Sequence, residues 1–114
     1  MKLLNSTMIV VAFICTQAFA ESLNEKVARN ASNCLVGHIA TKSDKFQSGK
    51  TSEYIFLIEQ ILGSEKASEA IKESEKKLNS AVRMLGSSKK EEGSFLIKQF
   101  CPAVDEIVSM QAKA

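Results

Sequence analysis

The stretch SLNEKVARNASNCLVGHIAT, residues 22–41, decides the fold. Its apolar residues recur at steps of three and four, which is the spacing of a helix with one buried face. They are Leu23, Val27, Ala31, Cys34, Leu35 and Ile39. We therefore predict a helix over residues 22–41, with the thiol of Cys34 directed toward the core.

The residues before this helix have the pattern of a secretory signal. Lys2 gives a basic start, Met8 to Ile14 is an unbroken apolar run, and Ala18-Phe19-Ala20 offers small residues for cleavage. The apolar run is shorter than the roughly 20 residues of a membrane anchor. We predict a cleaved signal peptide over residues 1–20 and a single helical domain over 21–114, in a periplasmic or secreted protein. An uncleaved N-terminal anchor is the alternative.

Two cysteines, Cys34 and Cys101, stay in the chain after cleavage, because Cys15 leaves with the signal. An even number of cysteines in an exported chain favours a disulfide. We predict a bond between Cys34 and Cys101 that joins the first helix to the last. Two free thiols or an intermolecular bridge are the alternatives.

The charges of the mature chain are almost balanced. Removal of Lys2 lowers the 15 basic residues to 14, against 13 acidic residues, so the net charge becomes +1. The charges are mixed along the chain, whereas phosphate backbones require a concentrated positive surface. This pattern excludes nucleic acid as an expected partner, and no stable membrane anchor is expected after cleavage.

Two more helices are predicted in the middle of the chain. The first begins at Thr51 or Ser52 as its cap and stops at Gly63. The next runs from Glu65 to about Leu85, with Ser64 as its cap, and residues 86–93 form the following turn. Its expected buried stripe consists of Ala67, Ala70, Ile71, Leu78, Ala81, Val82 and Leu85.

The last predicted helix runs from about Glu91 to Gln111 and contains Pro102. The apolar stripe keeps its phase across the proline, and a helical wheel of about 100° per residue places Pro102 on the solvent side. A kinked helix fits this pattern; two short helices with a turn at Cys101 are the alternative. The predicted fold is all-α, a small bundle of about four helices, with the first and last joined by one disulfide.

The sequence SGKTS, residues 48–52, ends like a phosphate-binding loop. Such a loop requires a glycine five residues before Gly49, where this chain has Asp44, and it must follow a buried strand. We interpret residues 43–51 as a polar turn and Lys50 as a solvated turn residue. No cofactor is expected.

His38, the only histidine, follows Cys34 by one helical turn. A structural zinc site needs four ligands, and Cys101 is the only other thiol of the mature chain, so no metal site is expected. A hydrolase would need a nucleophile and an orienting acid beside His38. We expect instead a half-buried His38 with a local hydrogen bond, no catalytic residue, and solvated carboxylates at Asp105 and Glu106. The glycosylation sequon at Asn30 falls within a helix and is treated as chance.

Phe56 departs from the pattern of its helix. Its neighbours Leu57 and Ile58 fall on the apolar arc, whereas Phe56 projects between Glu59 and Gln60. An exposed aromatic residue beside an already apolar helix is a candidate partner contact, although a helix covered on both sides would bury it.

Three functions are weighed on these observations. The first is a non-enzymatic exported protein that binds another protein, or itself as a homodimer. In layout alone the chain resembles small periplasmic stress chaperones and immunity proteins, which implies an inhibitor or chaperone-like role. The second is a small-molecule carrier with an apolar cavity of more than about 300 Å³. The third is a weak hydrolase that uses His38.

Overall fold

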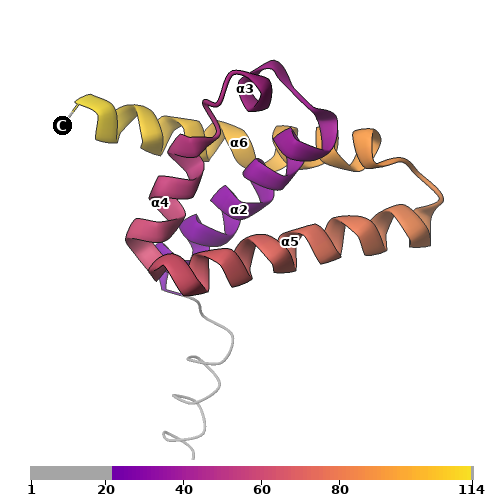
Figure 1. Ribbon diagram of the computed structural model, residues 1–114, viewed down its shortest axis with the longest axis horizontal. Helices are drawn as coiled ribbons and strands as arrows, with labels where there is room; N and C mark the ends of the chain where they lie inside the picture. The colour runs from indigo at the N-terminus through magenta and orange to yellow at the C-terminus, as the bar shows by residue number, and fades with distance from the viewer. Residues whose placement is uncertain (1–21, 114) are drawn as a thin grey trace, which may run out of the picture.

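The computed structural model describes residues 22–113, which form five helices and no strand (Figure 1). The helices are α2 (Leu23–Thr41), α3 (Asp44–Gln47), α4 (Ser52–Leu62), α5 (Ser64–Leu85) and α6 (Lys89–Lys113). The all-α prediction is confirmed, and α3 is the addition to the four predicted helices. The predicted signal peptide lies outside the described residues. None of the helices over residues 22–113 combines the length and apolar character that a bilayer crossing requires.

Helix α2 is the central element of the fold. It packs against α4, α5 and α6, most extensively against α6. Its start is capped by Ser22, whose Oγ accepts a hydrogen bond of 3.1 Å from the Glu25 amide. Its predicted apolar face holds the core, because Ala31, Cys34 and Leu35 are at most 1% exposed. Leu23 was wrongly assigned to this face: it is the first residue of the helix and is 78% exposed.

The segment between α2 and α4 contains a short helix where a turn was predicted. Ser43 caps α3 by accepting a 3.2 Å hydrogen bond from the Phe46 amide. Lys50 is exposed, as expected. Thr51 occupies the cap position of α4, but its side chain makes no capping hydrogen bond and is buried.

A single residue, Gly63, separates α4 from α5. Its φ of 84° lies in the region that favours glycine, and it both ends α4 and caps α5. The prediction that Ser64 caps α5 is therefore wrong: Ser64 is the first helical residue, and its Oγ donates to Glu59 Oε2 at 3.1 Å. Leu85 was also wrongly assigned to the buried stripe. It is 70% exposed because the end of α5 extends beyond the core.

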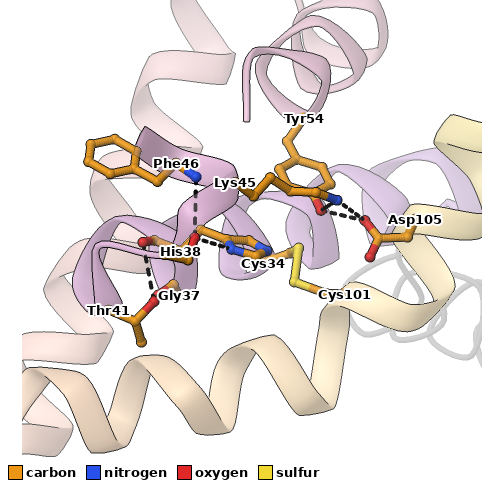
Figure 2. The surroundings of a disulfide bond; sticks show 10 residues. Cys34, Gly37, His38, Thr41, Lys45, Phe46, Tyr54, Cys101 and Asp105 are labelled. Atoms are coloured by element: carbon orange, nitrogen blue, oxygen red, sulfur yellow. Dashed lines mark hydrogen bonds and ion pairs between the residues drawn. A yellow bond between two sulfur atoms is a disulfide. The ribbon is translucent and has the colours of Figure 1, made fainter. Parts of the chain in front are cut away.

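The turn before the last helix is shorter than predicted. Ser88 Oγ accepts a 3.1 Å hydrogen bond from the Glu91 amide, so α6 begins at Lys89 and includes Gly93. The helix continues through Pro102, which is exposed. Figure 2 shows that the ribbon of α6 changes direction beside Cys101, as a proline that cannot donate its backbone hydrogen bond would cause.

Candidate functional site

The predicted disulfide lies at the contact between α2 and α6. The Cα atoms of Cys34 and Cys101 are 5.0 Å apart, and the two residues are 0% and 3% exposed. The bond thus joins the first described helix to the last, 67 residues apart in the sequence, as the cysteine count predicted.

Four polar residues meet beside this disulfide, and we call them the polar cluster: His38, Lys45, Tyr54 and Asp105 (Figure 2). They come from α2, α3, α4 and α6 respectively. His38 and Asp105 each follow a bonded cysteine by four residues, so each lies on the same helical face as that cysteine.

The hydroxyl of Tyr54 is the centre of the hydrogen bonds in this cluster. It donates to Asp105 Oδ1 and accepts a 2.9 Å hydrogen bond from Lys45 Nζ. Lys45 Nζ also lies 3.4 Å from Asp105 Oδ1 and 5.1 Å from the centroid of the Tyr54 ring. These contacts tie α3, α4 and α6 together.

His38 also contacts the ring of Tyr54. The two rings are stacked with centroids 5.7 Å apart, and His38 Nδ1 is 2.6 Å from Ser43 Oγ. The predicted local hydrogen bond is confirmed, but His38 is only 8% exposed and is therefore buried rather than half-buried. Burial, followed by the charge of Lys45, lowers the pKa of His38 despite the opposing influence of Asp105.

The same environment keeps Tyr54 protonated and Lys45 charged. Burial, together with the hydrogen bond to Asp105, raises the pKa of Tyr54 above its ordinary value. Burial opposes the charge of Lys45, but its contacts with Tyr54 and Asp105 outweigh that effect and raise its pKa. Tyr54 is therefore a neutral donor and Lys45 a cation at neutral pH.

Asp105, the carboxylate of the polar cluster, is not hydrogen-bonded to His38. Asp105 bonds Tyr54 and Lys45, and His38 bonds Ser43, whose Oγ also accepts from the Phe46 amide. A hydrolytic triad needs the acid hydrogen-bonded to the histidine that activates the nucleophile. Glu106 is exposed, as expected. The Asp105 side chain is 43% exposed and therefore partly solvated, but the expectation missed its bonds to Tyr54 and Lys45.

A second feature surrounds Phe56 on α4. Phe56 is 61% exposed, whereas the next two residues, Leu57 and Ile58, are 2% and 0% exposed. Phe56 lines a surface hollow of about 620 Å³, which we call the Phe56 groove. Its lining includes Glu53, Ile55, Phe56, Glu59, Val108 and Gln111, from α4 and the end of α6.

Sequence reasoning identified Phe56 and His38 but missed Lys45, Tyr54 and Asp105 as partners. The spacing offered one signal: Cys34 precedes His38, and Cys101 precedes Asp105, by four residues each. Once the disulfide is predicted, this spacing places the two polar residues on neighbouring helical faces. Nothing in the sequence indicated that Lys45 would reach them from α3.

Comparison with known proteins gives no relative for this chain: no family model matches it, and neither does any curated protein or solved structure.

Proposed function

We propose that this chain is a small exported, non-enzymatic protein that binds another protein through the Phe56 groove. An inhibitor, immunity or chaperone-like role would use such a surface. The observation that supports the proposal is the 61% exposure of Phe56 directly beside the buried Leu57. Aromatic residues are frequent centres of protein interfaces.

The lining of the groove indicates the chemistry of the partner. Ile55, Phe56 and Val108 supply apolar surface, and the charged residues that line the groove are the carboxylates Glu53 and Glu59. An apolar segment flanked by lysine or arginine would complement both features. An amphipathic helix of the partner, laid into the groove, is the recognition mode that fits best.

Export of the protein is the second part of the proposal. A buried disulfide between α2 and α6 is the kind of bond that forms and persists in oxidising compartments. The residues that carry the signal pattern lie outside the described part, so the disulfide and the sequence pattern support export independently. Mass spectrometry of the exported protein would test it, with Glu21 as the expected first residue. A mass that includes residues 1–20 would contradict it.

A photo-crosslinking experiment tests the groove directly. A photoreactive phenylalanine analogue is placed at residue 56 in the cells that produce the protein, and at residue 95 as the matched control. Phe95 on α6 is 58% exposed, nearly as much as Phe56, but does not line the groove. We expect one distinct protein adduct from residue 56 and none of the same kind from residue 95. Equal adducts from both positions would contradict the proposal.

A carrier of small apolar molecules is the second candidate, because about 620 Å³ exceeds the roughly 300 Å³ of a small ligand pocket. Against it, the side chains of Ile55, Phe56 and Gln111 in this hollow are exposed, so the groove is open rather than enclosed. Native mass spectrometry separates the two. A carrier would retain a small molecule at one per chain, and a Phe56→Ala variant would lose it.

A further inference from the structure

Three potential metal-binding side chains come together beside the polar cluster. The sulfur atoms of Cys34 and Cys101 and a ring nitrogen of His38 all lie within 4.8 Å of one another. All three residues are buried. Thiolate and imidazole bonds to a metal are about 2.0 to 2.3 Å long, so ligands of one ion lie at most about 4.6 Å apart. The three side chains are within a few tenths of an ångström of that limit.

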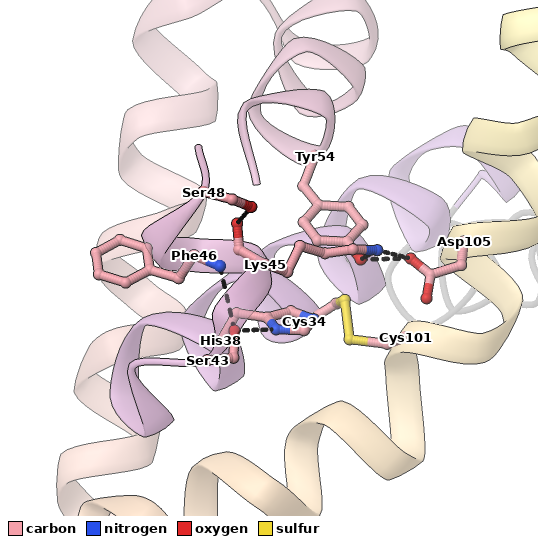
Figure 3. Close-up of polar contacts among 9 residues, drawn as sticks. All are labelled: Cys34, His38, Ser43, Lys45, Phe46, Ser48, Tyr54, Cys101 and Asp105. Carbon is pink, nitrogen blue, oxygen red and sulfur yellow. Dashed lines mark hydrogen bonds and ion pairs between the residues drawn. A yellow bond between two sulfur atoms is a disulfide. The ribbon is translucent and has the colours of Figure 1, made fainter. Parts of the chain in front are cut away.

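The histidine ring is held in an orientation suited to this task. Nδ1 is engaged by Ser43 Oγ at 2.6 Å, and Tyr54 stacks on the ring face. Figure 3 shows the other ring nitrogen, Nε2, on the side of the disulfide. A hydrogen bond to one nitrogen that directs the other toward a metal is the usual support of a histidine ligand.

We propose that the reduced form of this chain binds Cu⁺ through Cys34, Cys101 and His38. A dithiol breaks the S–S bond and is oxidised to its own disulfide, so that two electrons and two protons pass to the cysteines. Cu⁺ then displaces both thiol protons and forms two Cu–S bonds and one Cu–N bond. The disulfide and the copper complex are therefore mutually exclusive states of one site.

The ligand set selects the ion. Thiolates favour Cu⁺ and Zn²⁺ over harder cations. Structural zinc takes four ligands, whereas within residues 22–113 no fourth cysteine, histidine or carboxylate joins this group. The complex of Cu⁺ with two thiolates is anionic, and the ammonium of Lys45, which lies 5.1 Å from the centroid of the Tyr54 ring that stacks on His38, offsets that charge. Two soft thiolates and one imidazole in a buried site thus fit Cu⁺ best.

The test uses the mature chain reduced by a dithiol, freed of it without air, and titrated with Cu⁺ against a chromogenic Cu⁺ chelator. We expect one Cu⁺ per reduced chain and none in the disulfide form. X-ray absorption should show two sulfur ligands and one nitrogen ligand. His38→Gln keeps both thiols and should weaken binding about tenfold or more, whereas exposed Phe95→Ala should not change it.

Several results would overturn the proposal. One is equal Cu⁺ affinity of the wild type and His38→Gln, since binding would then require the cysteines alone. Another is tight binding of Zn²⁺ without Cu⁺. The reduced chain can also unfold before Cu⁺ is added, and circular dichroism detects this. Such a chain should regain its helices when Cu⁺ is added, because metal binding and folding are coupled. Failure to refold would also overturn it.

Discussion

A Cβ atom added to Gly37 would lie 2.8 Å from the carbonyl oxygen of Gly93, so α2 and α6 cross with their backbones in contact. A Cβ added to Gly93 would meet the Gly37 carbonyl at 3.0 Å and the Ala40 Cβ at 2.9 Å. Both glycines are therefore required by space rather than by backbone conformation. The Cys34–Cys101 bond joins the same two helices, with Cys34 three residues before Gly37 on α2 and Cys101 eight residues after Gly93 on α6.

Gly37→Ala should lower the free energy of unfolding by about 1 to 3 kcal/mol, because the new methyl group must displace backbone. The better helix propensity of alanine, worth about 1 kcal/mol, offsets only part of this cost. Urea denaturation measures the change. Ser94→Ala, at an exposed neighbour of Gly93, is the control and should stay within about 0.5 kcal/mol. A stabilised Gly37→Ala protein would show that the helices do not cross so closely.

Removal of the disulfide should be the more costly change. The bond closes a loop of 67 residues, for which the chain-entropy model gives about 4 kcal/mol. Cys34→Ser combined with Cys101→Ser should lower the free energy of unfolding by about 2 to 5 kcal/mol. Thiol titration of the exported wild type should find no free thiol. Two free thiols in a protein of unchanged stability in reductant would contradict this prediction.

His38 should make stability depend on pH in the disulfide-bonded protein. Its pKa is lowered in the folded state, mainly by burial, so the unfolded chain takes up a proton first as pH falls. The stabilising contribution is complete above the unfolded pKa of about 6.5 and declines below it. We expect the urea midpoint to fall between about pH 7 and pH 5, and His38→Gln to reduce this slope. An unchanged slope in that variant would exclude His38 as the cause.

Tyr54→Phe tests the polar cluster. The change removes the hydroxyl that donates to Asp105 and accepts from Lys45, and should cost about 1 to 2 kcal/mol, since hydrogen bonds to charged groups are the stronger ones. A double-mutant cycle with Asp105→Ala isolates the pair. In the Asp105→Ala background the cost of Tyr54→Phe should shrink, and equal costs in both backgrounds would show that the two residues are not coupled.

Local patterns in the sequence were sufficient to predict the four longer helices and the disulfide, but not the short helix α3. The three- and four-residue spacing around Cys34 defined the buried face of α2, and the same periodicity separated Phe56 from Leu57. These features depend on neighbours within one or two turns of a helix. They can therefore be recognised in short stretches of sequence.

The polar cluster and the glycine crossing could not be predicted in this way. Lys45 reaches Asp105 across 60 residues because α3 folds back over α2, and a loop of polar residues gives no periodic signal for such a return. Gly37 and Gly93 carry no side chain, so they add nothing to the periodic pattern of apolar residues from which the buried faces were predicted. Ser64 was misassigned because Gly63 joins α4 to α5 without a linker.

The affinity of the Phe56→Ala variant for the crosslinked partner, purified and titrated by calorimetry, tests the proposed function most directly. The account predicts a loss of more than about 1 kcal/mol of binding, roughly fivefold, with stability within about 0.5 kcal/mol of wild type. Phe95→Ala should bind like the wild type, and buried Leu57→Ala should lose about 2 to 5 kcal/mol of stability instead. Unchanged affinity of a folded Phe56→Ala protein would contradict the account.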